Sequence, residues 1–210
     1  MFLKINELEA CTQSLIKDIE YVVSHISKQE TSNLLACMED AQRIFIYGSG
    51  RSGLIGQAFA MRLVHLGKQV YFVGDSTTPP IKKDDLLIVI SNSGKTPCVK
   101  SISQIARSQQ AQVVSIIGNP HSPVGQLASF HVELPSQKRN NLVYGPLTKD
   151  SSDDGSVVQL SRNKMKNCHP PLGTLFELSA MFYLDSLIPV LMNNLSETEE
   201  GMRTRHANLE

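Results

Sequence analysis

The stretch RIFIYGSGRSG, residues 43–53, joins a short apolar strand directly to a glycine-rich turn. A helical pattern follows from Ser52 to His65, and Gly67 stands where a helix-terminating glycine is expected. Glycines in such a turn allow close backbone approach, and the free N–H groups at the start of the helix attract an anion. The order of strand, glycine turn and helix is typical of an α/β protein with an anion-binding turn.

Four more short runs of β-branched and aromatic residues predict strands: QVYFV (69–73), LLIVIS (86–91), QVVSIIG (112–118) and FHVEL (130–134). The first strand and the next three runs have the character of strands buried on both faces, whereas the last alternates like an edge strand. A second helix, from about Thr96 to Gln109, has Pro97 in its first turn, where the missing N–H costs nothing. We therefore predict a three-layer αβα sandwich with a five-stranded parallel sheet, of the flavodoxin-like or Rossmann-like kind.

The chain of 210 residues is expected to form a single domain. A helical segment at 1–40 should precede the sheet, with an amphipathic helix around 15–26 and a short helix capped by Thr31. A polar insertion at about 135–169 has little apolar pattern, and a stretch of this length is either a functional lid or disordered.

Helices are also expected near the C-terminus, at 174–206. The long one, from about Thr174 to Met192, is apolar nearly all round and should be buried in the core or against another subunit. Pro189 is placed to kink it near its end. The run SETE (196–199) has the spacing of a capping box, which predicts a short final helix.

The composition argues against several classes of protein. Lys plus Arg and Asp plus Glu each number 20, so the formal net charge is zero, which argues against a nucleic acid or a membrane surface as partner. The four cysteines form no CxxC pair, and His25, His121, His131 and His169 have no ligand spacing, so neither a metal site nor a disulfide framework is expected. The cysteines are instead expected to be small, mostly buried residues. Without an apolar N-terminal signal or an apolar span of ~20 residues, the chain is expected in the cytoplasm.

A second hydroxyl-rich turn, SNSGKT at 91–96, ends the third strand and opens the next helix. Because the carboxyl ends of parallel strands meet at one edge of a sheet, both turns should converge on one crevice, where hydroxyls and backbone N–H groups suit a phosphate. The alternative is that each serine or threonine only caps a helix. The candidate phosphate-binding residues are Gly48, Ser49, Gly50, Arg51, Ser52, Ser91, Asn92, Ser93, Gly94, Lys95 and Thr96.

Gly48, Gly50 and Gly53 also form a literal GxGxxG, the pattern of a dinucleotide-binding turn. That pattern comes with an acidic residue at the end of the second strand, which binds the ribose. Here Asp75 stands beyond that position, and the second hydroxyl-rich turn is not part of the pattern. Both observations count against dinucleotide binding.

In this order, GSGRSG and SNSGKT resemble the turns of the sugar isomerase (SIS) domain family, whose members bind phosphosugars. Three further motifs make the chain most similar to the 6-phospho-3-hexuloisomerases of that family: FAMRLVHLG (59–67), PLGTLFE (171–177) and RHANLE (205–210). The resemblance covers nearly the whole chain except 135–169, where the family makes a much shorter connection.

The resemblance implies an activity as well as a fold. It implies a single SIS domain that interconverts 3-hexulose 6-phosphate and fructose 6-phosphate, in the ribulose monophosphate route of formaldehyde assimilation. It also implies that the enzyme needs no cofactor and is a homo-oligomer, usually a tetramer. Two alternatives stay open: another phosphosugar aldose–ketose isomerase, of the arabinose 5-phosphate type, and a SIS module that binds a phosphosugar without converting it.

Such a reaction needs a base that moves a proton between adjacent carbons through an enediolate, and a second group that moves the oxygen protons. The resemblance favours Glu177 as the base, although Thr174-x-x-Glu177 is also the spacing of a capping box. His65 is near the end of the helix that starts at Ser52, roughly 20 Å from its own turn at ~1.5 Å per residue, so it should act on a neighbouring subunit's site. His206 is able to serve its own site or a partner's, and a purely structural role is the alternative for both histidines.

Overall fold

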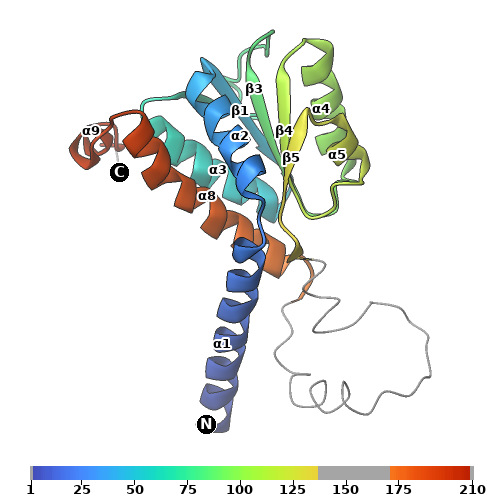
Figure 1. Cartoon of the computed structure of the whole chain (residues 1–210), viewed down its shortest axis with the longest axis vertical. Helices are drawn as coiled ribbons and strands as arrows, with labels where there is room; N and C mark the ends of the chain where they lie inside the picture. The colour runs from blue at the N-terminus through green and yellow to red at the C-terminus, as the bar shows by residue number, and fades with distance from the viewer. Residues whose placement is uncertain (1, 137–170, 209–210) are drawn as a thin grey trace.

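A computed structural model describes residues 2–136 and 171–208 of the chain (Figure 1). The described helices are α1 (Phe2–Ser24), α2 (Lys28–Asp40), α3 (Arg51–His65), α4 (Pro97–Ser108), α5 (Pro123–Leu127), α8 (Thr174–Asn194) and α9 (Glu199–Thr204). The described strands are β1 (Arg43–Gly48), β2 (Gln69–Phe72), β3 (Leu86–Ser91), β4 (Gln112–Ile117) and β5 (Phe130–Glu133). From residue 137 onward, the polar insertion expected at 135–169 lies outside the described residues.

The five strands form one parallel sheet in the order β2-β1-β3-β4-β5, which confirms the predicted architecture. Each strand lies within one residue of the apolar run that predicted it. β3 lies between β1 and β4 and is buried at all six positions, because its apolar side chains enter the clusters on both faces of the sheet. β5 is an edge strand, as predicted. The expectation that β2 is buried on both faces is wrong, because β2 is the other edge and is exposed or half-buried throughout.

Two apolar clusters hold the three layers together, one on each face of the sheet. Side chains of a strand point alternately to its two faces, so β1 contributes to both clusters. Ile44 and Ile46 belong to the cluster under α2, α3 and α8, whereas Phe45 belongs to the cluster under α4 and α5. Figure 1 shows the same division, with α4 and α5 on the side of the sheet opposite α3 and α8.

Helix α3 begins so close to the end of β1 that glycine is required on both sides of the contact. A Cβ atom at Gly48 would lie 2.7 Å from the carbonyl oxygen of Ser52, and one at Gly53 would lie 2.7 Å from the carbonyl oxygen of Gly48. Real side chains do not approach backbone atoms so closely, so these two glycines set the tight turn between strand and helix.

The start of α2 differs from the prediction. Its N-cap is Ser27, whose hydroxyl accepts a hydrogen bond from the Glu30 N–H, and Thr31 lies one turn inside the helix. The Thr31 hydroxyl donates to the Ser27 carbonyl and accepts a hydrogen bond from the Tyr183 hydroxyl of α8 at 3.1 Å. Burial raises the pKa of Tyr183 to about 12. Thr31 therefore joins two helices of one layer instead of capping one.

The final helix also starts later than its capping-box spacing predicts. Ser196 has a φ of 53°, a left-handed conformation that breaks the chain before a helix can begin there. Thr198 is the N-cap of α9, and its hydroxyl accepts a hydrogen bond from the Gly201 N–H at 3.0 Å.

Helix α8 is buried on one side only. By length and composition it is the single helix, within residues 2–136 and 171–208, that is apolar enough to cross a membrane, yet 50% of its most apolar stretch is buried inside the protein. It packs against α1, α2 and α3. Pro189 lies within the helix, which continues to Asn194. The expected burial in the core is confirmed for the sheet-facing side, whereas Met181, Phe182 and Val190 are exposed on the other.

The contact between β1 and α3 predicts a cost for any side chain placed in it. Gly53→Ala should lower the free energy of unfolding by about 1–3 kcal/mol, because the atom in its way is a backbone oxygen and cannot rotate aside. Urea unfolding followed by circular dichroism measures this, with Lys100→Ala on the exposed face of α4 as control, expected within about 0.5 kcal/mol of wild type. A Gly53→Ala protein as stable as the control would show that the contact relaxes freely.

Candidate functional site

The two hydroxyl-rich turns meet in one cavity. β1 and β3 are paired neighbours in the sheet, with Gly48 opposite Ile90, so the turn that follows β1 lies beside the turn that follows β3. The cavity between them has a volume of about 240 Å³. It is lined by Ser49, Ser52, Ile90, Ser91, Asn92, Ser93, Thr96 and Val99. The turns therefore converge as the sequence predicts, on a cavity of the size of a phosphate group and part of a small ligand.

Neither helix that opens at this cavity uses a serine or threonine hydroxyl as its cap. The N-cap of α3 is Gly50, and the N-cap of α4 is Thr96, whose side chain makes no capping hydrogen bond. The serines of the second turn accept hydrogen bonds from their own loop: Ser91 from the Gly94 N–H at 3.1 Å, and Ser93 from the Lys95 N–H at 3.3 Å. A hydroxyl that accepts in this way can still donate its own hydrogen to an anion. The hydroxyls of Ser91, Ser93 and Thr96 therefore do not cap a helix.

A third turn, which follows β4, packs against the second hydroxyl-rich turn. A Cβ atom at Gly118 would lie 2.2 Å from Oδ1 of Asn92, and one at Gly94 would lie 1.8 Å from Oγ of Ser122. Gly94 also has a φ of 62°, and its carbonyl accepts a hydrogen bond from the Val124 N–H at 3.1 Å. Sequence reasoning missed this turn, although Gly118 at the end of a predicted strand was a signal for it.

Glu177 lies beside the two turns, in contact with Arg51. The Arg51 Nε donates a hydrogen bond to the Glu177 carboxylate, which is mostly buried. A Cβ atom at Gly173 would lie 3.2 Å from Oε1 of Glu177 and 3.4 Å from Nδ2 of Asn92, so the carboxylate and the amide border the same space. Residues from the first turn, the second turn and α8 thus come together here.

The capping-box interpretation of Glu177 is wrong. The N-cap of α8 is Gly173, which has no side chain, and Thr174 lies inside the helix with its hydroxyl donating to the Pro171 carbonyl at 2.6 Å. The Glu177 carboxylate is bound to Arg51 instead of the helix start. Five of the eleven candidate phosphate-binding residues are not among those that line the cavity: Gly48, Gly50, Arg51, Gly94 and Lys95.

The two candidate histidines lie together at the other end of α3. The rings of His65 and His206 are 5.1 Å apart between centroids, with His65 buried and His206 exposed. Arg205 fixes this end, since its Nη1 donates to the His65 carbonyl at 2.8 Å and contacts the Glu197 carboxylate at 2.7 Å. The 15 residues of α3 place the pair roughly 20 Å from Arg51 at ~1.5 Å per residue. One chain therefore brings Glu177 to both turns but does not bring the histidines there.

A cysteine that sequence reasoning missed lies at the edge of the first turn. Cys98, in the first helical turn of α4, is exposed, so the expectation of mostly buried cysteines is wrong for this residue, whereas Cys11 and Cys37 are partly buried. A hydrogen bond with Tyr47 lowers the pKa of the Cys98 thiol, with a smaller contribution from Ser49, and the same bond raises the pKa of Tyr47. The hydrogen bond with Tyr47, near the end of β1, therefore favours the thiolate form of Cys98. Ser49, the other partner of this thiol, lines the cavity.

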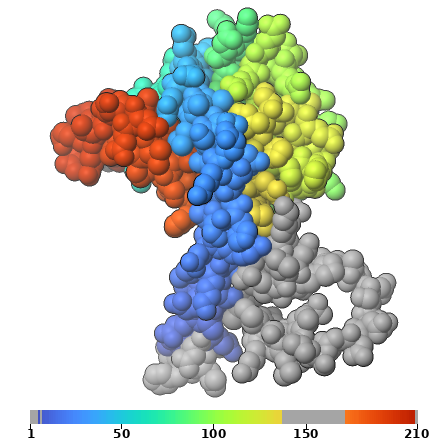
Figure 2. Space-filling view, viewed as in Figure 1, coloured from blue at the N-terminus to red at the C-terminus, as the bar shows by residue number. Residues whose placement is uncertain are grey.

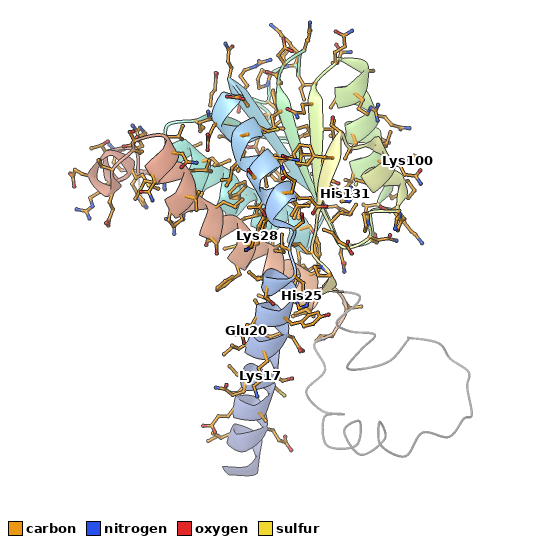
Figure 3. The ribbon with its side chains drawn as sticks, in the orientation of Figure 1. Lys17, Glu20, His25, Lys28, Lys100 and His131 are labelled. Atoms are coloured by element: carbon orange, nitrogen blue, oxygen red, sulfur yellow. The ribbon has the colours of Figure 1, made fainter. Side chains whose placement is uncertain are left out.

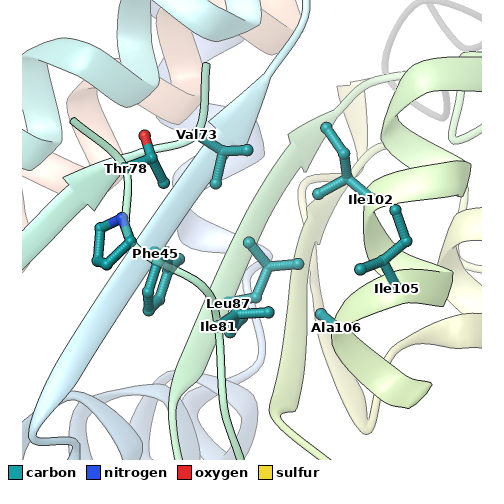
Figure 4. A pocket seen from close by; sticks show the side chains of 9 residues that line it. Phe45, Val73, Thr78, Ile81, Leu87, Ile102, Ile105 and Ala106 are labelled. Carbon is teal, nitrogen blue, oxygen red and sulfur yellow. The ribbon is translucent and has the colours of Figure 1, made fainter. Parts of the chain in front are cut away.

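Another cavity, of about 150 Å³, lies between β1, β3 and α4 and carries no charged side chain (Figure 4). Its lining is Phe45, Val73, Thr78, Pro79, Ile81, Leu87, Ile102, Ile105 and Ala106. Such a lining offers almost nothing to bind a phosphate, in contrast to the hydroxyl-lined cavity between the two turns. In the described part of the chain, no three His, Cys, Asp or Glu side chains are grouped so as to hold a metal ion.

Comparison with known protein families identifies the class of protein to which this chain belongs. The SIS domain family model matches residues 38–159, more than half of the chain. With a five-stranded parallel sheet and paired hydroxyl-rich turns at its carboxyl edge, the chain belongs to the SIS domain family.

Within the family, several relatives of nearly the same length carry one name. A 3-hexulose-6-phosphate isomerase of Methylomonas aminofaciens is 35% identical, over 93% of this chain and 96% of the relative. A 3-hexulose-6-phosphate isomerase of Bacillus subtilis (strain 168) is 32% identical, over 93% of this chain and 95% of the relative. A solved structure from Methanococcus jannaschii, from which a molecular function of 3-hexulose-6-phosphate isomerase was inferred, is 31% identical with a TM-score of 0.71, over 98% of this chain and 99% of that one.

Proposed function

We propose that this chain is a sugar-phosphate isomerase that interconverts 3-hexulose 6-phosphate and fructose 6-phosphate through an enediolate. The observation that carries the proposal is the cavity between two hydroxyl-rich turns, with a mostly buried carboxylate held at its side. The names of full-length relatives supply the sugar. In the cell, the reaction belongs to the ribulose monophosphate route of formaldehyde assimilation, and we place the enzyme in the cytoplasm.

The phosphate of the sugar binds in the cavity between the two turns, where the hydrogen-bond donors carry no full charge. Ser91 and Ser93 donate their hydroxyl hydrogens, and Ser52 and Thr96, at the starts of α3 and α4, line the same cavity. The positive ends of the two helices add a favourable interaction of about 0.3–1 kcal/mol each at exposed positions. Ser49 and Ser52 complete the set of hydroxyls from the first turn.

Glu177 is the base in this proposal. Its carboxylate takes the proton from C2 of 3-hexulose 6-phosphate, which leaves an enediolate across C2 and C3, and then returns a proton to C3 to give fructose 6-phosphate. Arg51, in contact with the carboxylate, places a positive charge close to the oxygens on which the negative charge develops. The Asn92 amide lies on the same side of the site.

The proton on the substrate oxygens is moved by His65 or His206 of a neighbouring subunit. The His65 ring and the Glu177 carboxylate of one chain lie at opposite ends of α3, which is too far for both to contact one small sugar. The active enzyme is accordingly a homo-oligomer, a tetramer, whose sites are shared between subunits.

Phosphate binding by the second turn is tested with a double substitution. Ser91→Ala with Ser93→Ala should weaken binding of fructose 6-phosphate by a few kcal/mol, because each lost hydrogen bond to a charged group contributes about 1.5–3 kcal/mol. Isothermal titration calorimetry measures the change. Ser108→Ala, which removes an exposed hydroxyl further along α4, is the control and should bind like wild type. An unchanged affinity in the folded double variant would move the phosphate site elsewhere.

The base is tested with Glu177→Gln in an assay that follows fructose 6-phosphate formed from 3-hexulose 6-phosphate. Glutamine can still accept the hydrogen bond from Arg51 but cannot take a proton, so turnover should fall by about 10²–10⁴-fold while substrate binding persists. Exchange of the carbon-bound proton with deuterated solvent should stop as well.

Glu200→Gln is the matched control, since it makes the same change in a carboxylate that is paired with Arg203 on α9. The control should keep wild-type turnover. More than about a tenth of wild-type turnover in Glu177→Gln would exclude this carboxylate as the base. Wild-type protein that binds the sugar phosphate without turnover would identify a binding module instead of an enzyme.

A further inference from the structure

The side chain of Asn92 extends from the second hydroxyl-rich turn toward the start of α8. A Cβ atom at Gly173 would lie 3.4 Å from Nδ2 of Asn92 and 3.2 Å from Oε1 of Glu177. An amide donor from one element and the candidate base from another therefore border the same small space. Asn92 also lines the cavity between the two turns, so this residue adjoins both the phosphate site and the carboxylate.

Gly173 keeps this space open. Its φ is −88°, a negative value that residues with side chains also adopt, so the backbone does not require glycine here. A side chain at this position would instead come within 3.2–3.5 Å of the amide and the carboxylate. An oxygen atom in its place lies close to hydrogen-bonding distance from both groups. The missing side chain thus leaves room for a substrate oxygen between Asn92 and Glu177.

The amide of Asn92 is oriented with its oxygen inward. Oδ1 lies against Gly118, where a Cβ atom would be only 2.2 Å away, and it accepts no hydrogen bond from any described residue. A buried acceptor without a partner lowers the stability of the fold, so this orientation needs an explanation. It turns the donor end of the amide toward Gly173 and Glu177. The side chain is therefore arranged for what its Nδ2 contacts.

The position of α8 beside the second turn is fixed by packing. Helix α8 contacts α1, α2 and α3, and Figure 2 shows α8, in red and orange, directly against the blue of α1 and α2. At its first turn, Glu177 is also bound to Arg51 of α3. Donors that are held in place before the reaction need little rearrangement during it, which makes them effective in catalysis.

Ionisable donors on the nearby elements do not reach this space. Figure 3 shows His25 after α1, Lys28 at the start of α2 and His131 on β5. None of these three lines the cavity between the turns or the hollow of about 340 Å³ beside the carboxylate. Among the described residues, the side-chain donors found beside the candidate base are Arg51 and Asn92.

We propose that Asn92 is a catalytic residue, whose Nδ2 donates a hydrogen bond to the sugar oxygen that becomes negative in the enediolate, in the space that Gly173 keeps open. When Glu177 takes the proton from C2 of 3-hexulose 6-phosphate, the electron pair of that C–H bond forms the C2–C3 double bond. The π electrons of the C3 carbonyl then pass to its oxygen, which becomes negative. The amide stabilises this charge and transfers no proton itself. In the reverse direction the oxygen on C2 takes the same place. This role of Asn92 rests on the proposed isomerase function.

The role is tested by steady-state kinetics of Asn92→Ala and Asn92→Asp, in the assay that follows fructose 6-phosphate formed from 3-hexulose 6-phosphate. Loss of one donor to an oxyanion costs about 10²–10³-fold in kcat, so both variants should lose turnover by about this factor while KM changes little. Asn92→Asp keeps the size of the side chain, so it separates loss of the donor from loss of packing. Asn33→Ala, at an exposed asparagine of α2, is the matched control and should keep wild-type turnover.

A role in phosphate binding would give a different kinetic pattern. Ser91→Ala with Ser93→Ala should raise KM, because contacts to the phosphate hold the substrate and the transition state alike. The same pattern in a folded Asn92→Ala protein, with raised KM and unchanged kcat, would assign Asn92 to the phosphate and overturn its catalytic role.

The space beside Gly173 is tested with Gly173→Ala. Its methyl group takes the place proposed for the substrate oxygen, so turnover should fall by about 10²-fold in a protein whose circular dichroism matches wild type. More than about a tenth of wild-type turnover in this folded variant would overturn the placement of the oxygen. Wild type that forms no fructose 6-phosphate would overturn the isomerase function itself, whereas an active wild type with a fully active Asn92→Ala variant would overturn only the role of Asn92.

Discussion

The close approach of β1 and α3 is the constraint on which the rest of the site depends. Because no side chain fits at Gly48 or Gly53, the helix starts within one short turn of the strand, at the carboxyl edge of the sheet. Pairing of β1 with β3 then fixes the second turn beside the first through backbone hydrogen bonds. The same start of α3 brings Arg51 to Glu177, which is 126 residues further along the chain. A cavity, its donors and its carboxylate thus follow from one steric contact.

The cavity between the two turns has hydroxyl and amide groups but no charged side chain in its lining. Hydroxyl groups and the ends of two helices provide partial charges that are held in place by the sheet, so they need little rearrangement when a ligand enters. Donors of this kind select by geometry, because each hydrogen bond weakens steeply when its angle is poor. Arg51 contacts the Glu177 carboxylate and is not among the residues that line this cavity.

The sheet and its two turns were predictable because both depend on residues that are neighbours in sequence. Apolar runs predicted every strand within one residue, but the same runs could not distinguish β2, an edge strand, from a central one. Contacts between distant segments were not predictable at all: Arg51 with Glu177, and His65 with His206, depend on how α8 and α9 pack against α3. Helix caps were misplaced at Thr31 and Ser196, because several neighbouring hydroxyls compete for each cap.

The late position of α8 in the chain has a consequence for synthesis on the ribosome. All five strands are made before residue 134, and the helix that covers much of one face of the sheet is made from residue 174 onward. During this interval Ile44, Ile46 and their neighbours on that face lack a cover that the finished protein has. Exposed apolar surface of this kind is what chaperones bind and what causes nascent chains to aggregate. The time between the last strand and α8 is therefore the interval in which this protein most needs protection in the cell.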